Sequence, residues 1–142
     1  MLNHVTFIIT KKQIIMTASK KLGIWMDHSF AHLMEFTSKH FEIETIESKF
    51  SIKENKKDLA KNENLMLEKE KKQLYDYYKK IGETIKNYKR VILFGPTDAK
   101  VELFDLLSED ERFLKIKFEI KNTDKMTASQ QHNFVKEYFS EA

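Results

Sequence analysis

A run of four apolar residues that stops at a glycine-proline pair constrains this chain more than any other stretch. The run is Val91 to Phe94, and Gly95 and Pro96 follow it. A short apolar run bounded by turn residues is typical of a strand buried on both faces. Proline cannot sit inside a central strand, so the strand ends before it. Residues 90–100 are therefore predicted to form a buried strand, a tight turn and the start of a helix, around which the rest of the chain packs.

The helix after this turn is predicted to run from about residue 98 to 108. Thr97 or Asp98 can cap its free backbone N–H groups. Helical spacing suggests one covered face, made of Val101, Phe104 and Leu107. Because α/β proteins place their sites where a strand leads into a helix, this turn is the first place to look for function.

Three further strands are predicted upstream, over residues 22–27, 31–36 and 41–47. Their short connections indicate an antiparallel meander. In the third strand, Phe41, Ile43 and Thr45 alternate with Glu42 and Glu44, which indicates one covered and one exposed face.

A long helix should follow the Lys-, Asn- and Glu-rich stretch 52–64, which we interpret as a loop or a frayed helix start. Its apolar stripe repeats at spacings of seven, four and three and consists of Leu67, Leu74, Tyr78, Ile81, Ile85 and Tyr88. Downstream, residues 113–120 alternate as a half-buried edge strand. A capping box from Thr127 to Gln130 then opens a final helix with Phe134, Val135, Tyr138 and Phe139 on one face.

The predicted order is strand, strand, strand, helix, strand, helix, strand, helix, with the first strand beside and parallel to the strand at residue 91. This is the element order of the ribonuclease H-like fold, an α/β mixed five-stranded sheet. A fold shared with nucleases does not carry their activity with it.

Composition narrows the function classes. The 142 residues suit one domain, expected to span residues 20–142, and the 25 basic residues are nearly matched by 22 acidic ones. The net charge of +3 does not by itself indicate nucleic acid. Without cysteine, thiol nucleophiles and thiolate metal sites are excluded and a reducing compartment is expected. No apolar run approaches the roughly 18 residues of a spanning helix, so no membrane partner is expected.

Residues 1–19 are expected to be a leader. Its apolar patch precedes Lys11 and Lys12 rather than following positive charge, so it matches a secretory signal poorly. It is either a mobile leader or extra edge strand, or it lies upstream of a true start at Met16.

Three segments carry a family resemblance: Gly23 to Ser29, Leu93 to Lys100, and Asp124 to Gln130. They resemble a group of small bacterial proteins that is similar to the middle domain of archaeal and eukaryotic class I peptide release factors; related proteins are called host-attachment proteins. The resemblance covers nearly all of residues 20–139. It implies a ribonuclease H-like, cytoplasmic domain that acts on or near the translation machinery and needs no cofactor.

The sequence departs from those release factors in one respect that matters for chemistry. They use a Gly-Gly-Gln loop to place water at the peptidyl-tRNA ester, whereas Gly23, Gly82 and Gly95 are all isolated here. Peptide release by that mechanism is therefore excluded. The expected function is a non-catalytic binding module that contacts the ribosome, an RNA or a protein.

Candidate site residues fall into two sets. Asp27, Asp98 and Asp124 follow predicted strands and could form the acidic edge of a metal-dependent nuclease, with Glu63 or Glu70 as a fourth carboxylate. Each is equally explained as a turn or helix-cap carboxylate. A metal on Asp27, His28 and His32 is a weaker alternative, because ordinary surface histidines are commoner. No Ser-His-Asp arrangement is indicated around Ser29.

The second set is basic and would bind an anion or a partner. At the turn it comprises Thr97, Lys100 and Lys125, although Asp98 would repel a phosphate. On the long helix it comprises Lys71, Lys72, Lys79 and Lys80. The simpler interpretation of these lysines is a solvated face with compensating carboxylates. A homodimeric protein-interaction module remains the third hypothesis, and it predicts an exposed apolar patch.

Overall fold

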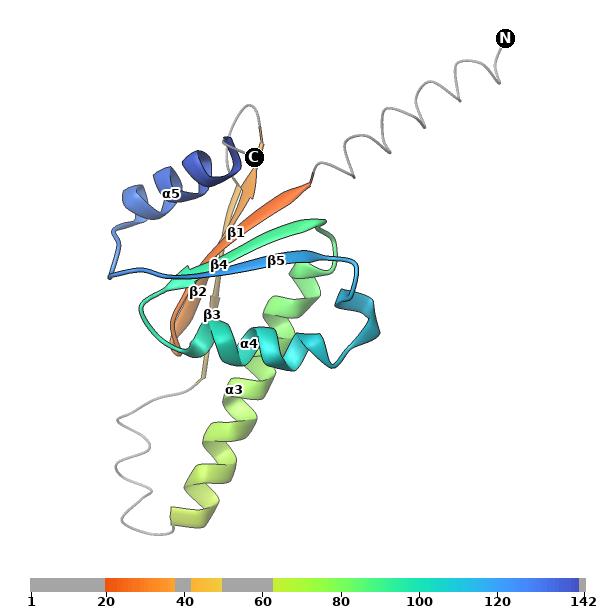
Figure 1. Cartoon of the computed structure of the whole chain (residues 1–142). Helices are drawn as coiled ribbons and strands as arrows, with labels where there is room; N and C mark the ends of the chain where they lie inside the picture. The colour runs from red at the N-terminus through yellow and green to blue at the C-terminus, as the bar shows by residue number, and fades with distance from the viewer. Residues whose placement is uncertain (1–19, 38–41, 50–62, 141–142) are drawn as a thin grey trace.

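The computed structural model describes residues 20–37, 42–49 and 63–140 (Figure 1). The expected leader and the stretch 52–62 lie outside these residues. The described elements, in chain order, are β1 (Lys21–Met26), β2 (Phe30–Phe36), β3 (Glu42–Glu47), α3 (Glu63–Ile85), β4 (Arg90–Gly95), α4 (Ala99–Ser108), the 3₁₀ helix η1 (Glu111–Phe113), β5 (Lys117–Asn122) and α5 (Ala128–Ser140).

The five strands form one mixed sheet in the order β3-β2-β1-β4-β5. β1 pairs antiparallel with β2 and parallel with β4, and β4 pairs parallel with β5. The predicted ribonuclease H-like order is confirmed, including β1 beside β4 and β5 at an edge. In this arrangement the carboxyl ends of β1 and β4 meet at one edge of the sheet, which is where the candidate site lies.

Helices cover both faces of the sheet (Figure 1). On one face α3 and α4 bury the odd residues of β4, Val91 and Leu93, together with Ile81 and Ile85 of α3. On the other face α5 packs Val135 and Phe139 in the cluster that contains the even residues of β4. Burial on both faces explains why Val91 to Phe94 is a continuous apolar run.

Two glycines allow close approach of these layers. Gly23 of β1 faces α5, and a Cβ there would lie 2.3 Å from Cγ2 of Val135. Gly95 ends β4 with φ +147°, and a Cβ there would lie 2.2 Å from the carbonyl oxygen of Met26. The turn after β4 can therefore pass against the end of β1 because residue 95 has no side chain.

The capping box is confirmed at the start of α5. The Thr127 N–H donates to Oε1 of Gln130 at 2.9 Å, and the Gln130 N–H donates to Oγ1 of Thr127 at 3.2 Å. These reciprocal bonds satisfy two backbone donors at a helix start. None of the helices in the described ranges is long and apolar enough to cross a membrane.

Two sequence predictions about covered faces were wrong in detail. In α4 the buried residues are Ala99, Lys100, Leu103 and Leu107, while Val101 is exposed. In β3, over the part whose burial the structure describes (residues 44–47), Ile46, opposite Ala31, is buried and Thr45 is exposed. In α4 the predicted Leu107 is buried and Phe104 packs against the core, so the error there is confined to Val101 and to the missed Ala99, Lys100 and Leu103.

The ends of two predicted elements also differ. Residues 113–116 belong to η1 and the following turn, so β5 begins only at Lys117, although Phe118 and Ile120 do pack toward the core. Leu67, expected in the covered stripe of α3, is exposed, because the covered stripe begins with the half-buried Leu74.

Candidate functional site

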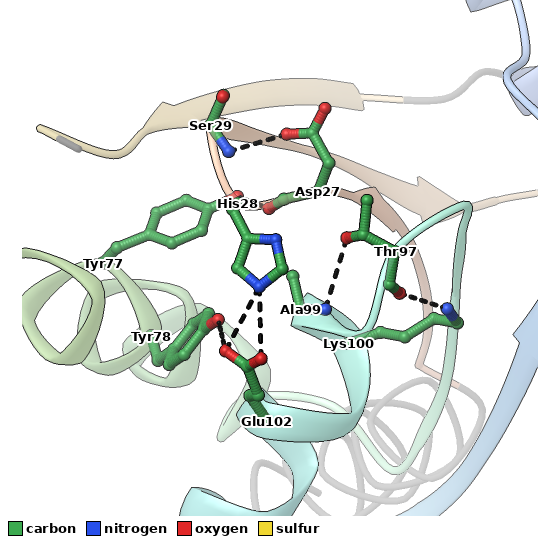
Figure 2. A network of polar contacts seen from close by, with 9 residues as sticks. All are labelled: Asp27, His28, Ser29, Tyr77, Tyr78, Thr97, Ala99, Lys100 and Glu102. Atoms are coloured by element: carbon green, nitrogen blue, oxygen red, sulfur yellow. Dashed lines mark hydrogen bonds and ion pairs between the residues drawn. The ribbon is translucent and has the colours of Figure 1, made fainter. Parts of the chain in front are cut away.

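The candidate site is a network of polar contacts at the carboxyl ends of β1 and β4 (Figure 2). It joins the turn after β1, the turn after β4, the first turns of α4 and the middle of α3. The close approach that Gly95 permits brings the two turns together. Sequence analysis placed Asp27, Thr97, Asp98 and Lys100 at this edge, and the structure shows what each contacts.

Asp27 shapes the turn between β1 and β2. Its Oδ1 accepts the backbone N–H groups of Ser29 at 2.8 Å and Phe30 at 2.9 Å. The hydroxyl of Tyr77, from α3, donates to the Asp27 carbonyl oxygen at 2.9 Å. An aspartate that accepts from the residues following it is the usual structure of an Asx turn. The Asp27 carboxylate is therefore engaged in holding the turn.

Glu102, in the first turn of α4, connects three elements. Its carboxylate accepts the Tyr78 hydroxyl at 2.6 Å and lies 3.2 Å from Nε2 of His28 (Figure 2). Burial, reinforced by the hydrogen bond to Glu102, raises the pKa of Tyr78, so this tyrosine stays protonated and acts as a donor. Burial likewise raises the pKa of Tyr77, with Asp27 nearby as a second cause.

His28 and Glu102 both reach solvent, with side chains 32% and 46% exposed. The Glu102 carboxylate orients the imidazole of His28, and the hydroxyl of the buried Tyr78 holds that carboxylate in place. Within the described residues, Ser29 Oγ makes no hydrogen bond to His28, so a nucleophilic triad is not assembled at this turn. The geometry supports a rigid, partly exposed polar edge.

Lys100 is fully buried. Its ammonium donates to the carbonyl oxygen of Thr97, and the Ala99 N–H donates to Oγ1 of Thr97 at 3.3 Å. Burial lowers the pKa of Lys100, while the nearby Asp98 opposes that shift. The lysine thus fastens the turn before α4 from inside. Asp98 occupies the N-cap position of α4 without a side-chain cap bond.

The three aspartates of the nuclease hypothesis lie in separate surroundings. Asp27 is in the β1–β2 turn, Asp98 precedes α4, and Asp124 is exposed between β5 and α5, next to the exposed Lys125. Among the described residues, no group of three His, Asp or Glu side chains could hold a metal ion.

His28 and His32 also have different partners. His28 contacts Glu102 of α4, whereas Nδ1 of His32 lies 2.7 Å from Oε1 of Gln131 in α5. Because α4 and α5 cover opposite faces of the sheet, the two imidazoles are held on opposite sides (Figure 1).

The basic candidates on α3 are exposed to solvent: Lys71, Lys72, Lys79 and Lys80. The ammonium of Lys79 lies 5.4 Å from the centre of the Tyr75 ring, a cation–π contact. Beside it, a cleft of about 540 Å³ separates α3 from the α4–η1 connection. Its rim carries both signs of charge: Glu83, Glu109, Asp110 and Glu111 line it together with Lys79 and Arg112, and Arg112 pairs with Asp110.

Sequence reasoning missed two members of the site and the partner of His32 on the other sheet face. Tyr77 was not in the predicted stripe, and Glu102 and Gln131 were not singled out. Glu102 is an acidic residue in the first turn of the helix that follows a Gly-Pro turn, and this position is a signal that could have found it. Gln131 gave no signal, since nothing local to α5 predicts a buried amide.

The fold is similar to parts of several solved proteins. Pelota from Archaeoglobus fulgidus matches with a TM-score of 0.54, 9% identity and coverage of 92% of this chain and 35% of that one. The archaeal translation termination factor aRF1 matches with a TM-score of 0.53, 18% identity and coverage of 87% and 35%. Dom34 from S. cerevisiae matches with a TM-score of 0.51, 20% identity and coverage of 86% and 34%.

This chain spans about a third of the length of these proteins. At such low identity the likeness establishes the fold alone. No protein-family model matches the sequence, and no curated protein does.

Proposed function

We propose that this chain is a translation-associated binding module that contacts the ribosome, or an RNA or protein partner there, without hydrolysing peptidyl-tRNA. The observation that carries the proposal is the fold, which matches parts of the translation termination factor aRF1, of the termination-like factor Dom34 and of Pelota over most of this chain. Dom34 is described as a termination-like factor that acts in RNA quality control and interacts with Hbs1. The three isolated glycines in the sequence support a role without release chemistry.

The exposed lysines of α3 are the proposed contact surface. Lys72 and Lys79 are seven residues apart, which places them about two turns apart on the same side of the helix. Neither lies within 4 Å of a described carboxylate, although Lys79 is near enough to Glu83 and Asp110 to be a minor cause of the lowered pKa of both. Unpaired lysines on a solvent-facing helix can replace the counterions of a phosphate backbone, and such binding weakens steeply with salt.

Sedimentation of native protein from lysate through a sucrose gradient tests this function. We expect the wild type to travel with ribosomal particles at about 50 mM salt and to remain near the top well above about 200 mM. The K72E/K79E variant should stay at the top even at low salt. A matched control, K115E/K136E, changes the net charge equally at two exposed lysines elsewhere and should behave as the wild type. Wild-type protein at the top under both conditions would contradict the proposal.

A second candidate is a protein-contact or self-association role for the start of α3. Leu65 and Leu67 are 64% and 51% exposed and, being two residues apart on a helix, lie on nearly opposite sides of it, so each is a separate apolar contact point. Light scattering after size-exclusion chromatography tests self-association. A dimer that L65S/L67S converts to a monomer would favour this role, whereas a monomeric wild type would exclude the homodimer.

A further inference from the structure

Helix α5 covers only part of the sheet face on which it lies. It packs on β1 and β2, while Lys117, Glu119 and Lys121 of β5 are all exposed. The register places Lys117 beside Arg90 and Lys121 beside Phe94, so these side chains share the α5 face of the sheet. Between α5 and β5 lies a cleft of about 380 Å³, which we call the α5 cleft; it is lined by Arg90, Val91, Lys117, Phe118, Glu119, Tyr138 and Phe139.

The charges along this cleft are mostly positive and unpaired. Arg90 and Lys117 line it, Lys121 lies against the ring of the lining residue Tyr138, and Lys21 is beside Arg90 on β1. Among the described lining residues Glu119 carries the one carboxylate. None of the four cations forms an ion pair with a described residue. Cations that lack a carboxylate partner attract an external anion more strongly than paired ones, because no internal charge has to be displaced.

Aromatic rings hold the cations in place and form one wall. Lys121 Nζ lies 5.4 Å from the Tyr138 ring centre, and the Arg90 guanidinium lies 5.6 Å from that of Phe139. Phe134 stacks on Phe94 at 4.2 Å and lies parallel to Tyr138, with an interplanar angle of 8°. A ring leaves the charge of a cation uncompensated, so these contacts position the cations without neutralising them.

A positively charged groove beside aromatic side chains is the chemistry that recognises single-stranded nucleic acid. Cations track the phosphates, and a partly exposed ring offers a surface on which a base can stack. Lys117 and Lys121 are four residues apart on one strand, which separates them by about 13 Å. That separation allows them to contact different phosphates.

We propose that the α5 cleft binds the sugar-phosphate backbone of single-stranded RNA. Arg90, Lys117 and Lys121 contact phosphates, and Tyr138 stacks with a base. The choice of RNA rests on the proposed function. The assignment of the surface does not, because Tyr138 and Phe139 of the cleft belong to α5, and α5 lies on the opposite sheet face from α3 (Figure 1). The Glu119 carboxylate repels the phosphates and so lowers the affinity of the α5 cleft for RNA.

Fluorescence anisotropy of a labelled 12-nucleotide oligouridylate, titrated with the whole chain, tests the cleft. Removing two phosphate contacts in K117Q/K121Q should lower the slope of log K against log salt by about 1.4 and weaken binding about tenfold at 0.15 M salt. The control K49Q/K136Q removes the same charge from two exposed lysines that do not line the cleft and should leave the affinity within about twofold. Both pairs are exposed, so thermal melting should show unchanged folding.

Two single variants sharpen the test. E119Q should tighten binding, and Tyr138→Leu should weaken it without altering the salt slope, because stacking carries no charge. The proposal is overturned if the wild type does not bind, if K117Q/K121Q binds as the wild type does, or if K49Q/K136Q is weakened equally. Ribosome sedimentation tests the proposed function independently. If the protein binds the oligouridylate through Lys117 and Lys121 but stays at the top of the gradient, the translation role is refuted and the RNA-binding cleft is not.

Discussion

Replacing Gly23 by alanine should loosen α5, and replacing Val135 by alanine should relieve that effect. A Cβ at residue 23 would lie 2.3 Å and 2.8 Å from the two Val135 methyls, far inside ordinary contact. Overpacking of this kind costs about 1–3 kcal/mol, and the depth of overlap places Gly23→Ala near the upper end. Val135 is fully buried. Losing its two methyls removes about 1.6 kcal/mol of burial, and the remaining cavity brings the cost to about 2–3 kcal/mol.

The double variant should be less destabilised than the two single costs together. Once Val135→Ala has removed both methyls, the α5 atom nearest to the new Cβ is the Cβ of residue 135, at 3.1 Å in the present structure, so a small shift suffices. We expect a coupling free energy of about 2 kcal/mol, within the range measured for residues in contact. Urea denaturation of the four proteins gives the cycle. Additive costs, within about 0.5 kcal/mol, would refute the close packing of α5 on β1, which also positions the aromatic wall of the α5 cleft.

Further changes probe the site edge and the capping box. Gly95→Ala should prevent stable folding, since φ +147° and a Cβ 2.2 Å from a backbone oxygen cannot both be accommodated; a soluble, cooperatively unfolding variant would contradict this. Burial lowers the pKa of Lys100, so the folded chain releases this proton at a lower pH than the unfolded chain does. The free energy of unfolding of the wild type should therefore rise as the pH approaches the ordinary lysine pKa of about 10.4. Lys100→Met should remove this pH dependence. The free energy of unfolding of the variant minus that of the wild type should therefore be larger at pH 7 than at pH 10. Equal differences in urea midpoint at the two pH values would be evidence against a buried charge. Thr127→Ala should cost about 1 kcal/mol, whereas the exposed control Ser129→Ala should cost almost nothing.

The order and pairing of the strands could be predicted because their signals are local. Val91 to Phe94 is apolar at every position, as expected of a strand that is covered on both faces, and the Gly-Pro pair marks where that strand ends. Right-handed crossover connections then leave few topologies. The capping box at Thr127 was equally visible, because both partners lie within one helical turn.

The covered face of α4 could not be predicted with the same rules. Lysine is usually excluded from cores, yet its four methylenes pack well when the ammonium reaches a carbonyl, as Lys100 does at Thr97. Lys100 was expected to bind an anion, but its ammonium instead donates to the Thr97 carbonyl inside the turn.

The partners of the site edge were beyond sequence reasoning for a related reason. His28 meets Glu102 across 74 residues and Tyr78 meets Glu102 across 24. Only the packing of α3 and α4 on the same sheet face brings these groups together. The α5 cleft was missed similarly, because Arg90, Lys117 and Tyr138 become neighbours only when β4 and β5 pair beside α5.

Co-pelleting of the purified chain with purified ribosomes, measured against salt concentration, tests the central claim of translation-associated binding most directly. The account predicts saturable binding near 50 mM salt, a steep loss toward about 200 mM, and a shallower salt slope for K72E/K79E than for the wild type. Binding that is absent at low salt would contradict the claim. Binding with the same slope for both proteins would show that α3 is not the contact surface.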